Sequence, residues 1–332
     1  MALKAAERLR KFYSVFRGDD QVLVVINADP DSIGAALCVK RLLWHRVASV
    51  AICSISTVKR PDNVAMVDLM CHGLLKAADV VKNNYTRFVL VDSQPHHNEA
   101  YQKFRFDVII DHHPFVAMTC AGHVDIRPEY GATSTMMAEY LKAAKIRPSQ
   151  KLATALFLGI KTDTHDFQRK AFGEDIKAFE FLSRYISLAM IQKIEYSEID
   201  PGFLKYFQLA FNTRVIRRGK AYIHLGHVLT PDVCVLVADL FLKIKGVNWT
   251  FVSGIFGKKL VVIIRKSGLR YDAGKMAEKK FGQLGSAGGH TSMARAELPV
   301  ARLEGIVPCR DDRKVLQWLI ERIEGKPHEN KA

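Results

Sequence analysis

The sequence predicts an α/β fold, in which a doubly wound parallel-sheet domain precedes a smaller α+β domain. Three observations indicate this. Strand-like and helix-like segments alternate over the first half of the chain, and the pattern changes near residue 195. The length of 332 residues also suits two domains better than one. The predicted domains are 1–194 and 213–332, joined by a helical linker at 195–212.

Short apolar runs with β-branched residues in the first half have the composition of buried parallel strands. Helix-like segments surround them, and Ser32 is the expected N-cap of the helix that follows the first strand. The predicted strands are 21–27, 49–55, 87–92 and 106–111, and the predicted helices are 1–16, 32–46, 131–144, 152–164 and 172–185, with further helix expected within 63–81.

The second half of the chain has a different pattern, typical of an α+β domain. A helix-like segment, 198–219, breaks at Arg218-Gly219 and is followed by strand-like runs and a Gly-rich loop, GSAGGH. The predicted strands are 220–228, 249–257 and 259–267, with helices at 231–245 and 311–323 and the loop at 285–290.

Composition and charge narrow the classes of partner. Hydrophobic residues at 48% and charged residues at 25% predict a globular protein with a packed core. The net charge of +15 favours an anionic partner, although dispersed, solvated lysines explain it equally well. Six cysteines without a CxxC pair predict neither a disulfide framework nor a zinc knuckle, so a reducing cytoplasm is expected. No apolar run approaches the roughly 20 residues that span a bilayer, so no membrane partner is expected.

Acidic side chains follow three of the predicted strands. Asp29 and Asp31 follow the first strand, Asp92 ends the third, and Asp111 ends the fourth. The carboxyl ends of parallel strands meet at one edge of a sheet, which is where ligands bind in such folds. Two histidines come directly after Asp111, and Asp163 stands at the end of an apolar helix. We therefore expect these groups to converge.

Carboxylates together with imidazole suit Mn²⁺, while Mg²⁺ prefers oxygen ligands alone. A carboxylate that bridges two ions holds them roughly 3.5–4 Å apart, the spacing used to hydrolyse phosphate esters. Each motif taken singly has an ordinary explanation, because a DxD after a strand is often a turn or helix cap and a histidine pair often only packs. The pair His96-His97 illustrates this and is assigned no role. The order of the motifs, each at the end of a strand or helix, favours a metal site.

These motifs resemble those of the DHH phosphoesterases with a DHH-associated C-terminal domain, over nearly the whole chain. ADPDSIGAA, VLVDSQP, IIDHHP and GIKTDTHDF resemble the first to fourth family motifs, and GATSTMMAEYL resembles the segment between the third and fourth. VVIIRKS (261–267) and GSAGGHTSMA (285–294) resemble the strand-Arg and GGGH elements of the second domain. The resemblance implies an active site in the cleft between the two domains.

The resemblance also implies roles for individual residues of the first domain. Asp92 would bridge two metal ions, Asp31, His112 and Asp163 would complete one site with it, and Asp29 would belong to the other. Next to these ligands, His113 would face the scissile phosphate and donate to its oxygens. His113 and Asp92 are thus the implied catalytic residues.

In the second domain, the resemblance implies a group that binds substrate. Arg265 and His290 would hold a second phosphate or similar oxygens, and Ser267 is a weaker candidate on the same strand as Arg265. Gly288 and Gly289 would let the backbone approach an anion and donate N–H groups to it. Without the GGH motif, Arg265 would be read as a salt-bridged surface residue.

Two positions depart from the family pattern. A histidine usually stands four residues before the first aspartate of DxD, and here that position is Val25. In the branch resembling RecJ an aspartate often stands two residues before it, and here that position is Asn27, whose amide oxygen is a weak candidate ligand. His165 stands where glycine is usual, and it either compensates for the missing ligand or merely flanks the site. One metal site is therefore expected to be firm and the other weak.

The resemblance implies a metal-dependent phosphoesterase of the nanoRNase and pAp-phosphatase branch, an exonuclease-like oligoribonuclease. Hydroxide would attack phosphorus with two Mn²⁺ ions at the site, Mg²⁺ being the alternative ion. The partners implied are short oligonucleotides or nucleotides such as 3′-phosphoadenosine 5′-phosphate (pAp), and a homodimer is compatible with the family. The alternative is a nucleotide- or nucleic-acid-binding protein with an impaired metal site and little activity, which Val25 and Asn27 motivate.

Overall fold

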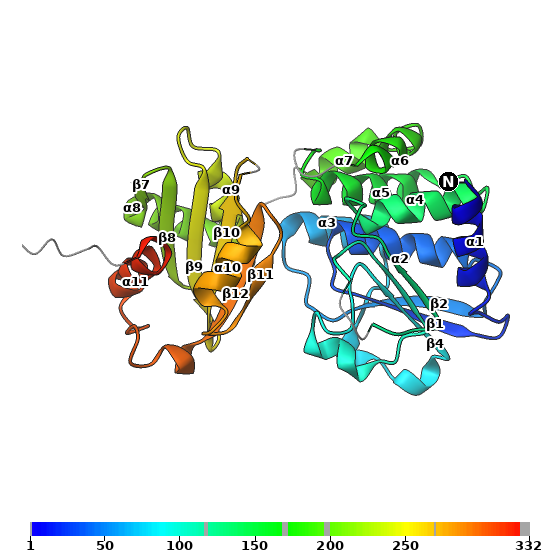
Figure 1. The fold of residues 1–332 in the computed structure, drawn as a ribbon, viewed down its shortest axis with the longest axis horizontal. Helices are drawn as coiled ribbons and strands as arrows, with labels where there is room; N and C mark the ends of the chain where they lie inside the picture. Colours follow the sequence, from blue (N-terminus) through cyan, green and yellow to red (C-terminus); the bar gives the residue numbers. More distant parts are fainter. Residues whose placement is uncertain (1, 116–118, 168–171, 196–199, 269, 326–332) are drawn as a thin grey trace, which may run out of the picture. The chain divides into compact units, whose positions relative to one another are not determined.

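A computed structural model describes residues 2–115, 119–167, 172–195, 200–268 and 270–325. Two compact units make up the chain, Met1–Glu198 and Ile199–Ala332, and each has its own sheet and helices (Figure 1). Among the described residues, no helix combines the length and the apolar character that a membrane span requires.

The first unit is built on a parallel sheet with the strand order β3-β2-β1-β4-β5-β6. All pairs between neighbouring strands are parallel, and the order of the strands along the chain reverses between β1 and β4. This reversal confirms the predicted doubly wound sheet and creates a switch point, where ligands bind in such folds. The strands are β1 (Gln21–Ile26), β2 (Ser49–Ser54), β3 (Leu75–Lys76), β4 (Arg87–Val91), β5 (Val108–Asp111) and β6 (His123–Ile126).

Helices cover one face of this sheet, where α2, α4 and α5 overlie β1, β2 and β4 (Figure 1). A smaller apolar cluster covers the other face, and it includes Val25, Leu90 and Tyr101. Tyr101 lies in a short 3₁₀ helix, Glu99–Lys103, which replaces an α-helix in the crossover from β4 to β5. The helices are α1 (Ala2–Tyr13), α2 (Pro30–Leu42), α3 (Pro61–Met70), α4 (Thr133–Ala143), α5 (Gln150–Asp163), α6 (Gly173–Ser183) and α7 (Leu188–Glu195).

The predicted N-cap of α2 is wrong. The helix begins at Pro30, and Asp29 is its N-cap, because proline is favoured in the first turn and the aspartate side chain accepts from the Ser32 amide at 2.9 Å. The Ser32 hydroxyl in turn accepts from the Asp29 amide at 3.0 Å, which completes a capping box. The four predicted strands of this unit are confirmed to within two residues at each end, whereas β3, β6 and α7 were not predicted.

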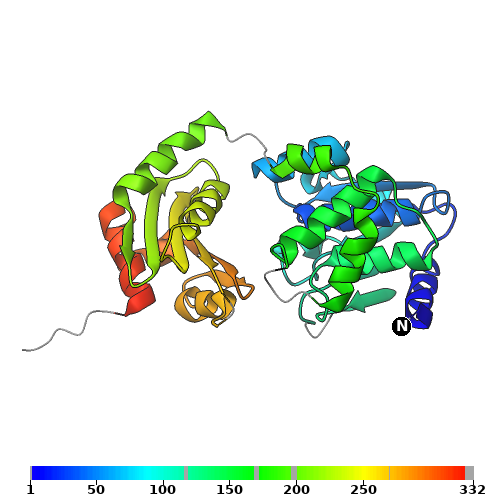
Figure 2. The same ribbon diagram turned by 90° about the horizontal axis from the view of Figure 1, so that it is seen from above.

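The second unit has a mixed sheet with the strand order β11-β12-β10-β9-β8-β7. Only the β8–β9 pair is parallel among the described pairs. Helices α8 and α9 pack on one face, and α10 and α11 pack on the other, which confirms the predicted α+β class (Figure 2). The elements are α8 (Leu204–Thr213), β7 (Val215–Arg217), β8 (Lys220–His227), α9 (Asp232–Leu242), β9 (Trp249–Phe256), β10 (Lys259–Lys266), α10 (Ala273–Phe281), β11 (Ser286–Gly289), β12 (Met293–Pro299) and α11 (Asp312–Glu324).

Two expectations for this unit need correction. The loop GSAGGH contains β11, because its backbone pairs with β12 although glycine-rich segments rarely form strands. The helix-like segment 198–219 ends at Thr213 and continues as β7, which pairs with β8. Helix α8 lies, except for its last residue, in the segment 195–212 predicted as a linker, and its buried Tyr206 and Ala210 pack on the core of the second unit.

Candidate metal centre

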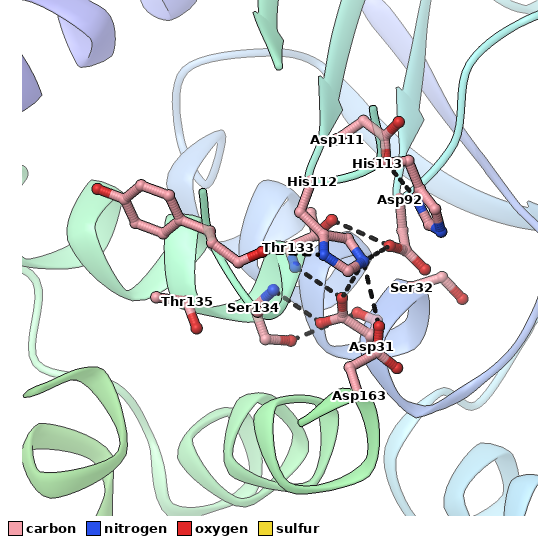
Figure 3. Close-up of polar contacts among 12 residues, drawn as sticks. Asp31, Ser32, Asp92, Asp111, His112, His113, Thr133, Ser134, Thr135 and Asp163 are labelled. Carbon is pink, nitrogen blue, oxygen red and sulfur yellow. Dashed lines mark hydrogen bonds and ion pairs between the residues drawn. The ribbon is translucent and has the colours of Figure 1, made fainter. Parts of the chain in front are cut away.

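Asp31 is fixed by two helices at the carboxyl edge of the first sheet. It lies in the first turn of α2, and its side chain is fully buried. The backbone amides of Thr133 and Ser134, at the start of α4, each donate to one of its oxygens at 2.7 Å (Figure 3). A helix N-terminus favours negative charge, so α4 opposes the effect of burial on the ionisation of this carboxylate.

A glycine on α5 makes room for this arrangement. A Cβ atom at Gly159 would lie 2.3 Å from the Ser134 Oγ and 2.9 Å from the Asp31 Cα. Any larger residue would therefore push α5 away from the helix turn that carries Asp31. Position 159 was not among the residues singled out from the sequence, because nothing local marks a close approach to a residue so far away along the chain.

Asp92 directly follows β4, at the switch point of the sheet. Its backbone φ of +59° lies in the left-handed region, where a non-glycine residue is uncommon and is tolerated best by Asp and Asn. The Thr133 hydroxyl donates to the Asp92 Oδ1 at 3.0 Å. The side chain is only 5% exposed, so the carboxylate points inward toward the centre.

His112 completes the centre, with its ring orientation set by the backbone. Its Nδ1 lies 3.3 Å from the Tyr130 carbonyl oxygen, and because a carbonyl only accepts, Nδ1 is the donor. In its neutral form, this ring would offer the lone pair of Nε2 to a metal ion, as in metal-binding histidines. Nε2 lies 3.1 Å from the Asp163 Oδ2, 3.4 Å from the Asp92 Oδ1 and 4.0 Å from the Asp31 Oδ2 (Figure 3).

The predicted first metal site is thus brought together. One ligand atom from each of Asp31, Asp92, His112 and Asp163 lies within 4.8 Å of the others. Three carboxylates and one imidazole nitrogen are the donor set that Mn²⁺ accepts, and Mg²⁺ would use the oxygens. The chemistry of this set fits a divalent cation.

Electrostatics support the same conclusion. Burial, followed by the charge of Asp163, raises the pKa of Asp29 to about 7 and that of Asp31 to about 6. Burial and the charge of Asp31 raise the pKa of Asp92 well above its usual range. Burial opposes the charge on His112, but the hydrogen bond and charge of Asp163 outweigh it and raise the pKa to about 9. The carboxylates repel one another, so a cation between them would relieve the repulsion.

The predicted second site has fewer candidate ligands among the described residues. Asp29 is close enough for Asp163 and Asp31 to raise its pKa, but its Oδ1 accepts from the Ser32 amide as the helix cap. Val25 is fully buried in the apolar cluster around Tyr101. Asn27 is exposed, and its Oδ1 accepts from the Ser56 hydroxyl at 2.6 Å. His165 lies in the turn after α5, with a φ of +50°.

His113 is held beside the metal centre by the acid that precedes it. Its Nδ1 lies 2.7 Å from the Oδ1 of the buried Asp111, and the Gln94 side chain donates to the Oδ2 of the same carboxylate at 2.7 Å. Burial opposes ionisation of Asp111, but the His113 hydrogen bond lowers its pKa to about 2. Although the sequence indicates no role for His97, its ring centroid lies 5.5 Å from that of His113.

In the second unit, the predicted substrate-binding residues gather at one end of the sheet. Arg265 is paired with Met293 across β10 and β12, and the His290 amide donates to the Met293 carbonyl at 2.7 Å. Arg265 also forms an ion pair with Asp239 of α9 at 2.8 Å.

The two glycine positions of the GGH motif differ in whether they could accommodate a side chain. Gly289 has a φ of +147°, and a Cβ there would lie 2.4 Å from the Met293 carbonyl oxygen, so this position needs glycine. A Cβ at Gly288 would meet open space. The Ser267 hydroxyl, near the end of β10, lies 3.4 Å from the Asn248 side-chain oxygen.

Comparison with known proteins identifies the first unit. Residues 21–160, which contain β1 to β6, α2, α4 and most of α5, match the model for the DHH family, N-terminal domain. The first unit is a DHH-family domain. The four clustered metal-ligand candidates include Asp31, Asp92 and His112 within the matched residues and Asp163 just beyond them.

Similarity to a known protein extends over most of the chain, beyond the residues that match the family model. An uncharacterized protein of Methanocaldococcus jannaschii is 33% identical over 301 residues, covering 90% of this chain and 61% of that protein. The chain thus spans about three fifths of that relative's length.

Two solved structures share the fold. An exopolyphosphatase-related protein from Bacteroides fragilis has a TM-score of 0.73 and 15% identity, covering 96% of each chain. RecJ from Thermus thermophilus, in complex with Mn²⁺, has a TM-score of 0.51 and 14% identity, covering 98% of this chain and 59% of RecJ.

Proposed function

We propose that this DHH protein is a metal-dependent phosphoesterase that hydrolyses short oligonucleotides, dinucleotides or pAp. The observation that carries the proposal is the buried group of three carboxylates and one imidazole, whose ligand atoms lie within 4.8 Å of one another. Buried charges of one sign are costly unless a counter-charge is bound. The DHH-family match and the net charge of +15 support a phosphate-bearing substrate.

The residues divide into groups with different tasks. Asp31, Asp92, His112 and Asp163 would hold one divalent ion, and Asp29 with Asp92 would hold a second, weaker one. Bound divalent ions at such centres lower the pKa of water and offset the charge that develops on phosphate oxygens. The Thr133 and Ser134 amides would hold Asp31 oriented as a ligand. Manganese is the ion to test first, since the RecJ structure with a similar fold contains Mn²⁺.

His113 would act on the substrate directly. Its Nδ1 lies 2.7 Å from the Asp111 Oδ1, so the other ring nitrogen, Nε2, is the one left to present an N–H to the substrate. That N–H would donate to a phosphate oxygen or protonate the leaving oxygen, while Asp111 keeps the ring in place. Arg265, Ser267, Gly288, Gly289 and His290 would bind the part of the substrate away from the bond that breaks.

The experiment that tests this function is hydrolysis of a labelled dinucleotide, a trinucleotide and pAp with Mn²⁺. We expect turnover of at least one substrate, and loss of turnover in His112→Ala and Asp92→Ala. The matched controls are His72→Ala and Asp19→Ala, which remove the same residue types from exposed positions of the first unit and should retain activity. Unchanged activity in both site variants would refute the assignment of the centre.

A second function has a specific observation in its favour. The burial of Val25 and the hydrogen bond between Asn27 and Ser56 leave few ligands for a metal ion beside Asp29. An impaired metal site of this kind would suit a nucleotide- or nucleic-acid-binding protein with little activity. Binding of all three substrates without turnover at saturating Mn²⁺ would favour this alternative over the enzyme.

A further inference from the structure

A cavity lies entirely within the second unit, at the end of the sheet where β8 and β9 begin and β10 ends. Its volume is about 310 Å³, and no described aspartate or glutamate lines it. Cations and aromatic rings provide most of its functional groups: Arg218, Lys220, Lys266, Arg270, Trp249 and Tyr271.

Three of these residues form one row across the sheet. Trp249 of β9 is the direct partner of Lys220 on β8 and of Lys266 on β10. Directly paired residues project from the same face of a sheet, so the two ammonium groups flank the indole. The Lys266 Nζ lies 5.7 Å from the centre of the Trp249 ring. The indole is itself fixed, because it stacks on Phe251 at 5.8 Å with an interplanar angle of 3°.

Lys266 is unusual because a lysine side chain is rarely buried. It is 4% exposed, and its ammonium group donates to the Gly268 carbonyl. No carboxylate of the described residues comes within ion-pair distance of it. Burial lowers the pKa of this ammonium and the charge of Asp272 opposes the shift, but the Asp272 carboxylate is engaged as the N-cap of α10. A buried charge without a carboxylate in ion-pair distance is costly, and an anion in the cavity would reduce that cost.

Lys220 and Arg218 add positive charge to the cavity, and nearby carboxylates neutralise little of it. Lys220 lies 4.0 Å from Glu324, and that carboxylate also pairs with Arg217 at 2.8 Å and accepts from the Tyr222 hydroxyl at 2.8 Å. Arg218 sits in the tight turn between β7 and β8, with a φ of +50°. At the rim, Tyr271 is 60% exposed and presents a ring on which a planar group can stack.

This cavity shares Ser267 with the Arg265 group, and its other lining residues are different. Arg265 and Lys266 are consecutive on β10 and therefore project to opposite faces of the sheet. Arg265 pairs with Asp239 of α9, whereas Lys266 contacts Trp249, which packs in the core formed with α10 and α11. Ser267, which was assigned above to the Arg265 group, directly follows Lys266 in sequence and also lines the cavity.

We propose that this cavity is a binding site for a nucleotide, in which Lys266, Lys220 and Arg218 hold the phosphate and Tyr271 stacks on the base. The proposal goes beyond the proposed function, because the site uses none of the metal-centre residues and should bind its ligand without a divalent ion. The phosphate could belong to a mononucleotide or to a nucleotide of a longer strand, and the chemistry of recognition is the same for both.

The test is binding by the full chain in EDTA, measured by titration calorimetry with AMP, a tetranucleotide and inorganic phosphate. We expect AMP and the tetranucleotide to bind, with inorganic phosphate about tenfold weaker because it lacks a base to stack. Lys266→Met keeps most of the packing volume and should weaken AMP binding at least about tenfold, the effect of losing one charge-assisted hydrogen bond. The matched control is Lys258→Met, which removes the same charge from an exposed turn at the other end of β10 and should change binding by less than about twofold.

Two further variants test whether AMP binds in this cavity and not at the metal centre. Arg218→Gln, on the turn, should weaken AMP binding even if Lys266→Met alters stability, which thermal unfolding will report. Asp92→Ala should bind AMP as the unaltered protein does, although it is expected to lose hydrolysis. Equal affinities of Lys266→Met and the unaltered protein would overturn the proposal. Equal losses in Lys266→Met and Lys258→Met, or loss of binding in Asp92→Ala, would also overturn it.

Discussion

Replacing Gly159 by alanine is the sharpest test of how the metal centre is built. In the interior of a helix this change normally stabilises a protein by about 1 kcal/mol. Here the new Cβ would lie 2.9 Å from the Asp31 Cα, so α2 and α5 must separate by about 0.5 Å to restore an ordinary 3.4 Å contact. Overpacking of this kind costs about 1–3 kcal/mol, and weakening one charged hydrogen bond to Asp31 costs about 1.5 kcal/mol more. We expect a net loss of about 2 kcal/mol in the free energy of unfolding.

The assay is urea denaturation of the metal-free protein, together with calorimetric titration of Mn²⁺. The displaced Asp31 should weaken Mn²⁺ binding about tenfold. Gly173→Ala is the matched control, because a Cβ there meets no atom within 4 Å, and stability should change by less than about 0.5 kcal/mol. Adding Ser134→Ala should recover part of the lost stability, since the Ser134 hydroxyl is the nearest obstacle, at 2.3 Å. A Gly159→Ala protein as stable as the unaltered one, with the same Mn²⁺ affinity, would refute this account of the helix contact.

Three further predictions concern charge and ligand supply at the centre. Asp92→Asn should raise the unfolding temperature of the metal-free protein, because it removes one of several buried like charges, and should abolish stabilisation by Mn²⁺; a lower unfolding temperature in EDTA would contradict this. Because the pKa values of Asp29 and Asp31 are raised from 3.8 to about 7 and about 6, the native metal-free protein holds more protons than the unfolded chain between those values. Its free energy of unfolding, measured in urea, should therefore fall as the pH rises from about 4 to about 7, and Mn²⁺ should flatten that slope. Val25→His should cost about 2 kcal/mol without metal and increase the stabilisation by Mn²⁺, whereas Leu23→His, buried in the same cluster, should show only the cost.

Much of the centre follows from local sequence. Short apolar runs that end in Asp92 and Asp111 predict strand ends, and the parallel sheet brings strand ends to one edge. The pattern also identified His112 and Asp163, which the structure places within 3.1 Å of each other. These predictions succeed because strand composition and strand-end acids are local signals that the sheet topology then combines.

The parts that escaped prediction depend on contacts between distant segments. Thr133 and Ser134 donate to Asp31 across about a hundred residues, and no spacing rule links a helix N-terminus to a particular acid. Ser32 looked like a cap because serine is favoured there, but Pro30 sets the helix start two residues earlier. Strand β11 was missed because its SAGG sequence has little strand propensity, and pairing with β12 overrides that preference.

The two edges of the parallel sheet have a consequence for self-association. At one edge, β3 consists of only Leu75–Lys76, so it offers a very short template for another strand. At the other edge, β6 carries the buried Asp125, which pairs with Arg127 at 2.8 Å, and a strand added there would have to accommodate this charged pair. Both devices oppose edge-to-edge sheet extension and thereby protect a long parallel sheet from aggregation. If the chain forms a homodimer, its first unit should therefore contribute a helical or loop surface rather than a sheet edge.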